Sequence, residues 1–281
     1  MTKEYTSLGL MSGTSGDGVD ASIIISDGKN NYRTISDEYF KYDEEIYHNI
    51  HNLKEKINSE KDLENHSKEI MKLEKKLTFF HAKVVQNLLK KTKVDLVGFH
   101  GQTIYHNSDQ KISKQLGDGK LLSQLLNKTI VCNFRENDIK QGGEGAPLTP
   151  IFHQLILKQH KIDIPSCVLN IGGISNLTIV SNYDHYDFTS RDIGPGNCLI
   201  DSWVRKNSNQ KFDESGKLAS RGKVNEIILE QAQELYSNRL NKKNLSLDVN
   251  DFDVSFARGL TLEDGTATLT DFTGHIIGTE L

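Results

Sequence analysis

The hydrophobic positions of this chain fall into short apolar runs and longer amphipathic stretches. Segments 5–11 and 19–26 are short and rich in β-prone residues, which predicts two strands of a β-hairpin. Residues 27–46 are polar, and we expect a turn and a further strand there. Residues 47–91 are helical in pattern, and from Leu63 to Leu88 apolar residues recur at mostly three- and four-residue steps, which predicts one face of a long helix with a solvated, charged opposite face.

The next segments continue the mixture of strands and helices. The patterns predict a buried strand at 94–99, a short helix at 120–127 and a strand at 129–133. The sequence is then punctuated by glycine and proline before it becomes helical again. We therefore expect a boundary between two lobes, which would comprise residues 1–134 and 135–281.

A second predicted hairpin follows the lobe boundary. Residues 166–181 again read as an apolar strand, a glycine-containing turn and an apolar strand, which repeats the pattern of residues 5–26. Such an echo suggests the internal duplication of one α/β unit. Two glycine turns that hold a nucleotide polyphosphate from opposite sides are the arrangement of actin and hexokinase. The pair therefore favours a two-lobed actin-like fold.

The first glycine turn, GLMSGTSGDGVDAS at 9–22, suits a phosphate group. Glycine allows close approach of the backbone to a ligand, and hydroxyl and N–H groups bind phosphate oxygens. A Walker A loop and a dinucleotide-binding fingerprint both require a helix next, whereas a strand follows here. The alternative is a plain hairpin with a flexible tip.

A third glycine cluster lies at 186–204. The pattern predicts a strand at 187–193, a Gly-Pro-Gly turn and a helix that begins after Asn197. Asp192 is then expected at the end of a strand beside a helix N-terminus, a common position for catalytic carboxylates. The alternative is a carboxylate that only caps backbone N–H groups. Asp201, on the helix, is expected to be structural or secondary.

Composition and charge narrow the class of protein. The net charge of −4 argues against general nucleic-acid binding, and 36% hydrophobic with 26% charged residues is typical of a soluble globular protein. The three cysteines form no CxxC pair, so we expect neither a zinc site nor a disulfide framework. We find no signal-peptide segment and no apolar run of membrane-spanning length. These features predict a cytoplasmic enzyme or binding protein that contacts no membrane.

Several motifs together resemble the anhydro-N-acetylmuramic acid kinase family. The motifs are MSGTSGDGVD (11–20), GFHGQTIYH (98–106), NFRENDIKQGGEGAPLTPIFH (133–153), LNIGGISN (169–176), DIGPGNCLIDSW (192–203) and NDFDVSFARGLTLEDGTATLTDFT (250–273). The resemblance covers nearly the whole chain. It implies a two-lobed actin-like (ribonuclease H-like) α/β kinase fold, in which mixed sheets are flanked by helices.

The resemblance also implies a reaction. Members of the family phosphorylate 1,6-anhydro-N-acetylmuramic acid with ATP, Mg²⁺ and water, open the anhydro ring in the same event, and give N-acetylmuramic acid 6-phosphate for peptidoglycan recycling. Asp192 matches the general base. The ATP-binding residues implied are Gly13, Thr14, Ser15, Gly16, Asp17, Gly18, Val19 and Asp20 in the first turn and Gly172 and Gly173 in the second.

This chemistry suggests further site residues. The sugar carries a lactyl carboxylate, for which Arg135 or Arg191 is a candidate partner because a guanidinium group binds carboxylates bidentately. Glu144 is a possible sugar contact, with a simple exposed turn as the alternative. The candidates for contacts with sugar hydroxyls are His100, Gln102 and Thr103, which we expect in a loop after a strand. Asp17 or Asp20 would hold Mg²⁺ through water, with a structural role for Asp20 as the alternative.

Two alternatives to the kinase stay open at this point. Relatives continue beyond the position of Leu281 through a further glycine-rich segment and a closing helix, so we expect a C-terminally truncated member. A truncated, non-catalytic relic would bind the sugar or a partner without turning over ATP. An actin-like ATPase would hydrolyse ATP without any sugar. The sequence does not give the oligomeric state, for which a homodimer is one candidate.

Overall fold

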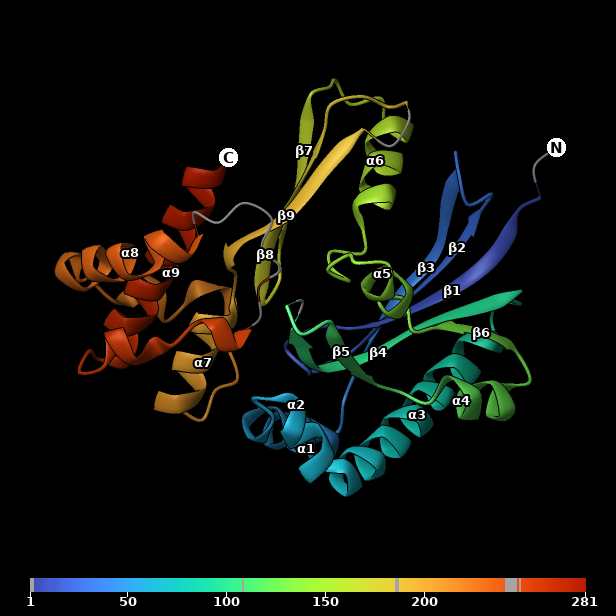
Figure 1. The fold of residues 1–281 in the computed structure, drawn as a ribbon, viewed down its shortest axis with the longest axis horizontal. Helices are drawn as coiled ribbons and strands as arrows, with labels where there is room; N and C mark the ends of the chain where they lie inside the picture. Colours follow the sequence, from blue (N-terminus) through green and yellow to red (C-terminus); the bar gives the residue numbers. More distant parts are fainter. Residues whose placement is uncertain (1–2, 108, 185–186, 241–246, 248) are drawn as a thin grey trace. The chain divides into compact units, whose positions relative to one another are not determined.

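A computed structural model describes residues 3–107, 109–184, 187–240, 247 and 249–281 (Figure 1). The chain divides into two compact units, Met1–Ile162 and Asp163–Leu281. The lobe boundary expected near residue 135 stays a prediction, because compact units and the lobes of a kinase fold need not be divided at the same residue.

The first unit is built on a six-stranded mixed sheet. Its strands are β1 (Tyr5–Ser12), β2 (Gly18–Ser26), β3 (Tyr32–Lys41), β4 (Leu96–Asn107), β5 (Ile112–Leu116) and β6 (Thr129–Cys132). They run in the order β3-β2-β1-β4-β5, and β6 also pairs with β4. The β1–β2, β2–β3 and β4–β5 pairs are antiparallel, whereas β4 is parallel to both β1 and β6. The predicted first hairpin and the further strand after it are confirmed.

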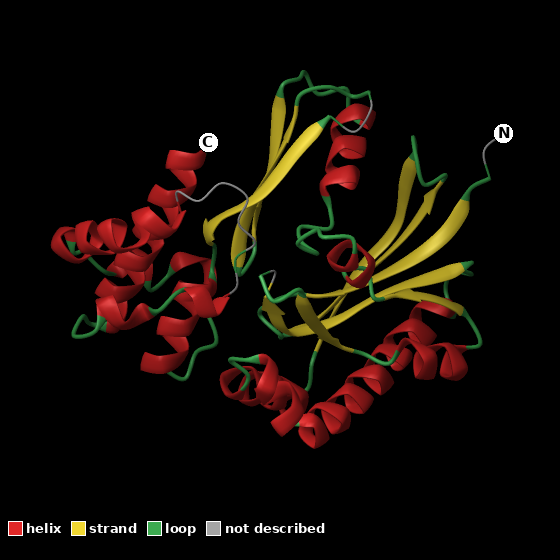
Figure 2. Cartoon of the chain, viewed as in Figure 1, coloured by secondary structure: helices red, strands yellow, loops and turns green. Residues whose placement is uncertain are grey.

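Six helices accompany this sheet. They are α1 (Glu44–Lys56), α2 (Glu60–Asn65), α3 (Ser67–Leu89), α4 (Gly119–Leu126), α5 (Glu136–Lys140) and α6 (Pro150–Gln159). Helices α3 and α4 lie along one face of the sheet, and their apolar residues join those of α1 and the strands in one core (Figure 2). The short helix predicted at 120–127 and the strand predicted at 129–133 are confirmed.

The helical pattern predicted between 47 and 91 is confirmed, and α3 is the long helix of this region, although the structure divides the region into three helices. Helix α1 ends at Lys56, and Ile57 has an extended backbone. The Asp62 carboxylate then accepts hydrogen bonds from Asn58 N at 3.2 Å and Ser59 Oγ at 2.7 Å. Such local side-chain bonds compete with helical ones and favour a turn. The periodic pattern continues across the break because α1 and α3 both pack on the same core.

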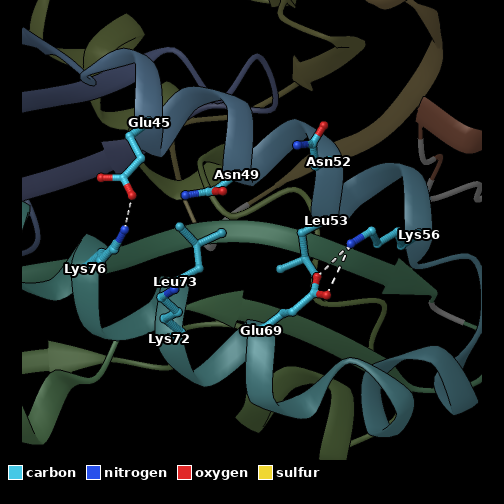
Figure 3. Close-up of a pocket in the computed structure, with 9 residues that line it drawn as sticks. All are labelled: Glu45, Asn49, Asn52, Leu53, Lys56, Glu69, Lys72, Leu73 and Lys76. Carbon is cyan, nitrogen blue, oxygen red and sulfur yellow. Dashed lines mark hydrogen bonds and ion pairs between the residues drawn. The ribbon is translucent and has the colours of Figure 1, made fainter.

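Helices α1 and α3 enclose a groove of about 300 Å³ (Figure 3). Leu53 and Leu73 form its apolar part. Two ion pairs cross it: Lys56 Nζ lies 2.9 Å from a Glu69 oxygen, and Lys76 pairs with Glu45. The remaining lining residues are Asn49, Asn52 and Lys72. The lysine- and glutamate-rich side chains therefore bridge the two helices at the surface, in keeping with the solvated face that the sequence predicts.

Strand β4 is longer than the sequence predicts. It continues from Leu96 to Asn107. The prediction that His100, Gln102 and Thr103 lie in a loop after a strand is therefore wrong, because they lie within β4. Gly101 explains how the strand continues. Its φ is +75°, and a Cβ there would lie 2.3 Å from the Leu116 carbonyl oxygen on the neighbouring strand. Only glycine permits this close approach, which brings His100 and Gln102 into the sheet.

The second unit contains a smaller sheet with helices. Strands β7 (Ser166–Ile171), β8 (Ile174–Val180) and β9 (Phe188–Pro195) form an antiparallel sheet in that order, which confirms the second predicted hairpin. The helices are α7 (Cys198–Asn207), α8 (Glu226–Leu240) and α9 (Leu262–Glu280). Short 3₁₀ turns lie at Glu214–Gly216, Ala219–Arg221, Val249–Asp251 and Val254–Ala257.

One face of the second sheet packs on α9. Leu177, Ile193 and Ile277 form a small buried cluster there, with Leu169 against it. A larger cluster joins α7, α8 and α9. Among the helices in the described residues, none is both long and apolar enough to cross a membrane.

Candidate active site

The glycine loop joins β1 to β2 in the first unit. Gly16 N donates to the carbonyl of Gly13 at 3.1 Å, which closes a tight turn. Gly16 has a φ of +63°, and a Cβ there would lie 2.9 Å from Ile50 Cγ2. Ser15 Oγ donates to the Asp17 carboxylate at 2.6 Å. The loop is therefore a defined turn that packs against α1. It differs from the plain hairpin with a flexible tip that was the alternative interpretation.

Three carbonyl groups of this loop are bound by the surrounding protein. The contacts are Gln102 Nε2 to Gly13 O at 2.9 Å, Lys54 Nζ to Thr14 O at 2.7 Å, and Tyr42 N to Asp17 O at 2.8 Å. These peptides are trans, so each N–H points away from the C=O in the same peptide plane. The N–H groups of Thr14, Ser15 and Gly18 therefore point away from the anchoring groups. Each of these three N–H groups is therefore a candidate donor to an anion.

Buried polar groups form a hydrogen-bond network at the residue that precedes the loop. Ser12 Oγ lies 2.7 Å from Tyr42 Oη and 3.3 Å from His81 Nε2, and His81 Nδ1 lies 2.8 Å from the Leu77 carbonyl. Burial lowers the pKa of His81 to about 4, so its ring is neutral at pH 7. This network connects β1 to α3 in the core. The start of the glycine loop is therefore held on rigid elements.

Gln102 is fully buried beneath the loop. Its Nε2 binds Gly13, whereas its Oε1 has no hydrogen-bond partner within the described part of the chain. The predicted contact between Gln102 and a sugar hydroxyl stays a prediction. In this structure the side chain links β4 to the glycine loop.

Two carboxylates lie at the end of the loop. Asp20 lies on β2, where its sequence neighbours Val19 and Ala21 are buried and Asp20 itself is exposed. Partial burial and the nearby Asp17 carboxylate raise the pKa of Asp20. Burial, Asp17 and Asp20 also raise the pKa of Tyr39 to about 12. The described residues include no cluster of three or more His, Cys, Asp or Glu that could hold a metal ion. One or two carboxylates beside a phosphate do fit Mg²⁺, which keeps several waters.

His100 and Arg135 form a second group of polar side chains in this unit. Arg135 Nη2 lies 3.0 Å and Nε 3.3 Å from His100 Nε2, and Arg135 Nη1 donates to the Gly145 carbonyl at 2.7 Å. A guanidinium group only donates, so His100 Nε2 accepts and Nδ1 donates its proton to the Gly101 carbonyl at 2.7 Å. Burial and the Arg135 charge lower the pKa of His100 to about 4.

His106, which the sequence did not single out, belongs to the same region. Burial and the charge of Arg135 lower its pKa to about 4, and its Nδ1 lies 2.9 Å from Ser113 Oγ. Thr103 Oγ1 accepts from Gln115 Nε2 at 3.3 Å. His106 stands in the GFHGQTIYH motif, but nothing in its pattern distinguished it from a structural histidine.

Glu144 lies in a turn folded around α5. Asp138 Oδ2 accepts from Gly145 N at 2.7 Å, and Gly145, with a φ of +73°, has no room for a Cβ because Ile139 lies 2.7 Å away. Burial, then the nearby carboxylates of Asp109 and Asp138, raise the pKa of the half-buried Glu144. The turn is therefore ordered by its own contacts, and a sugar contact of Glu144 stays a prediction.

In the second unit, Asp192 lies within β9 and is 8% exposed. Its Oδ2 accepts a hydrogen bond from Leu247 N at 2.8 Å. Asn176 on β8 stands directly opposite Asp192, and Asn170 on β7 opposite Asn176. These three residues form a polar row across one face of the sheet. The buried Oδ1 of Asn176 has no hydrogen-bond partner among the residues that the structure describes.

The side chain of Arg191 points to the opposite face of the sheet from Asp192 and has a different binding partner. Successive residues of a strand point to opposite faces, so Arg191 faces α9 whereas Asp192 faces away from it. Arg191 Nη2 forms an ion pair with Glu280 of α9. Its role in binding a sugar carboxylate stays a prediction, and so does that of Arg135.

The second glycine turn, Gly172-Gly173, is joined to the start of α7. The Gly173 carbonyl accepts from Gly196 N at 2.9 Å and from Cys198 N at 3.2 Å, and the Gly172 carbonyl from Asn197 N at 2.8 Å. The turn carbonyls thus satisfy N–H groups at the beginning of the helix. Asn197 is at the predicted N-cap position, but its side chain donates to the Ile171 carbonyl instead of capping the helix.

Comparisons with known proteins identify the family. The profile of the family "Anhydro-N-acetylmuramic acid kinase" matches residues 5–277. The chain belongs to the anhydro-N-acetylmuramic acid kinase family. It is therefore a sugar kinase, and its mixed sheet with flanking helices agrees with the two-lobed kinase fold that the sequence predicts.

Individual members of the anhydro-N-acetylmuramic acid kinase family support this assignment. The chain is 59% identical over 279 residues to an anhydro-N-acetylmuramic acid kinase of Pelagibacter ubique, an alignment that covers 99% of the chain and 74% of the relative. It is 35% identical to the kinase of Methylobacterium nodulans, with 98% and 76% covered. It is 36% identical to that of Rhodopseudomonas palustris, with 97% and 75% covered.

Proposed function

We infer that this kinase transfers the γ-phosphoryl group of ATP to 1,6-anhydro-N-acetylmuramic acid and opens the anhydro ring with water in the same event. The products are N-acetylmuramic acid 6-phosphate and ADP, a step of cytoplasmic peptidoglycan recycling. The observation that carries the proposal is the anchored glycine loop, in which three hydrogen bonds hold carbonyl groups and leave the N–H groups of Thr14, Ser15 and Gly18 pointing away from these anchors. Phosphoryl transfer depends mainly on such positioning and on charge stabilisation.

Each part of the site has a role in this reaction. Gly13 to Asp20 bind the ATP phosphates, and Gly172-Gly173 form a second phosphate segment. Asp17 and Asp20 would hold Mg²⁺, which would neutralise charge on the phosphates. Gln102 positions the loop through Gly13. Arg135 is the better candidate of the two arginines to meet the lactyl carboxylate, because Arg191 already forms an ion pair with the Glu280 carboxylate, whereas His100 and the Gly145 carbonyl orient Arg135.

Asp192 acts as the general base. It removes one proton from water as the water oxygen bonds to C1 of the sugar, and the bond between C1 and O6 breaks. The O6 oxygen released from the bridge attacks the γ-phosphorus, and the bond to the β-phosphate oxygen breaks. The low exposure of Asp192 and its bond from Leu247 N hold the carboxylate in place for this step.

The test is to incubate the purified chain with ATP, Mg²⁺ and the anhydro sugar and to follow products by mass spectrometry and ³¹P NMR. We expect one ADP for each sugar 6-phosphate formed, and no ADP without the sugar. ADP release without sugar would support an actin-like ATPase. Sugar binding without any product would support a non-catalytic relic.

A further inference from the structure

Asn176 carries a buried polar atom that the proposed reaction does not yet use. Its Oδ1 is buried and accepts no hydrogen bond from the described residues. A buried amide oxygen without a donor is unfavourable, so such atoms normally bind water or a ligand. The location of this atom indicates which ligand would donate a hydrogen bond to it.

Asn176 is the cross-strand neighbour of Asp192. The two residues are directly paired between β8 and β9, and paired residues project to the same face with Cβ atoms about 4.5–5.5 Å apart. The ladder has a register shift between Ser175 and Asn176, immediately before this pair. Such irregularities occur beside active sites, where they redirect a side chain. An acceptor amide therefore stands beside the proposed base.

We propose that Asn176 is a catalytic residue whose Oδ1 accepts a hydrogen bond from the attacking water. This proposal rests on the assignment of Asp192 as the base. A water molecule has two protons, and Asp192 removes only one of them. The second proton stays on the oxygen that becomes the C1 hydroxyl, and it needs an acceptor that does not remove it. An amide oxygen meets this requirement because it accepts hydrogen bonds without taking up the proton.

The arrangement also orients the water. When both protons are bound, one to the Asp192 carboxylate and one to Asn176 Oδ1, a lone pair of the oxygen is left to point at C1. Orientation of a nucleophile contributes to the rate without tightening the binding of ATP or sugar. Loss of the Asn176 acceptor should therefore lower kcat and leave both KM values nearly unchanged.

The primary variant is Asn176→Leu, which has similar volume and no acceptor. We expect kcat to fall by roughly 10–100-fold, the effect of one lost transition-state hydrogen bond, with KM for ATP and sugar within about threefold. The matched control is Thr178→Val on the same face of β8. Thr178 is fully buried and its Oγ1 lies 3.1 Å from Ser190 Oγ, so this variant reports the general cost of a lost buried polar contact.

A second variant tests whether the side chain at position 176 lies close to the base. Asn176→Asp places a carboxylate beside Asp192, and a like charge raises the pKa of the pair. The acid limb of the pH profile of kcat/KM should then shift to higher pH. An unchanged acid limb in an active Asn176→Asp enzyme would contradict the proposed proximity to the base.

Methanol provides the decisive comparison, because it carries one hydroxyl proton where water carries two. Once Asp192 removes that proton, methanol has none left for Asn176. In aqueous methanol, the ratio of methyl glycoside 6-phosphate to free sugar 6-phosphate should rise at least severalfold in Asn176→Leu and stay unchanged in Thr178→Val. An unchanged ratio in Asn176→Leu overturns the proposal. If both Asp192→Asn and the Asn176 variants behave like the wild type, the assignment of Asp192 as the base fails together with this inference. If the Asn176 variants behave like the wild type but Asp192→Asn is impaired, the proposed function stands and this inference alone is wrong.

Discussion

Gln102 Nε2 donates a 2.9 Å hydrogen bond to the carbonyl oxygen of Gly13, and this partly buried contact joins β4 to the glycine loop. The two residues are 89 positions apart in the chain. His100, two residues before Gln102 on the same strand, is bound to Arg135. The strand thus holds the proposed phosphate loop with one residue and a proposed sugar contact with another.

Gln102→Met tests this connection. Methionine fills a similar volume but donates no hydrogen bond to the Gly13 carbonyl. We expect the free energy of unfolding to fall by about 1–3 kcal/mol and the KM for ATP to rise, because the loop loses one anchor. Urea denaturation and steady-state kinetics measure the two effects. Gln86→Met, at an exposed position of α3, is the control. A wild-type KM for ATP in Gln102→Met would show that the anchor does not order the loop.

Gly13→Ala separates a phosphate role from folding. A Cβ at Gly13 would lie 3.7 Å from Ser15 Oγ, an ordinary contact, so we expect the stability to change by less than about 1 kcal/mol. The ATP affinity should fall clearly, because the methyl group would occupy space next to the outward N–H groups. Calorimetric titration with ATP measures this.

Gly16→Val is the comparison. It should destabilise the protein by itself, by about 1–3 kcal/mol, because of the positive φ and the nearby Ile50. Undiminished ATP binding by Gly13→Ala would count against a phosphate site at this loop.

The sequence predicts the elements that depend on local patterns. Both hairpins, the helix at 120–127 and the strand at 129–133 follow from short apolar runs and turn residues, which act over a few positions. The glycine loop was recognisable for the same reason. The sequence could not predict which groups bind the loop carbonyls. Lys54 on α1 and Tyr42 after β3 contact the loop because of the tertiary structure. In the sequence, Lys54 is indistinguishable from a solvent-exposed lysine on the surface of a helix.

Long-range contacts explain the other differences. The extension of β4 depends on the approach of Gly101 to Leu116 on β5, which no local pattern reveals. The opposite directions of Arg191 and Asp192 follow from strand alternation, but only the packing of α9 shows which face is covered. The sequence therefore offered both arginines as equal candidates, whereas the structure shows that Arg191 is engaged with Glu280.

The buried histidines predict how stability depends on pH. His81, His100 and His106 have pKa values of about 4 in the folded protein, against a reference of 6.5. Between these values the unfolded state binds more protons, so stability should fall as the pH decreases from about 6.5 to 4. Urea denaturation across this range measures the slope.

His106→Gln should reduce this slope by about one proton, or roughly 1.4 kcal/mol per pH unit. Gln86→Met, at an exposed position of α3, changes no titratable group and should leave the slope unchanged. If stability does not decrease as the pH falls from 6.5 to 4, the neutral state of these rings is wrong.

The two arginines should respond differently to substitution. Arg135→Ala should weaken binding of the anhydro sugar far more than binding of ATP, and more than binding of an analogue without the lactyl carboxylate, because a charged hydrogen bond is lost. Arg191→Ala should lose its contact with Glu280 and keep the preference for the lactyl group. Calorimetric titration with both sugars tests this. A preference that is lost in Arg191→Ala and retained in Arg135→Ala would reverse the assignment.

The most direct test of the proposed mechanism follows oxygen from labelled water in the wild type and in Asp192→Asn. The Asn side chain keeps the shape of Asp192 without its basicity, so kcat should fall by roughly 10²–10⁴-fold while the sugar is still bound. In H₂¹⁸O, the wild-type product should carry ¹⁸O at C1 of the sugar and none in the transferred phosphate, as mass spectrometry of the sugar 6-phosphate will show. Label in the phosphate, or a near-wild-type rate for Asp192→Asn, would contradict ring opening by water activated at Asp192.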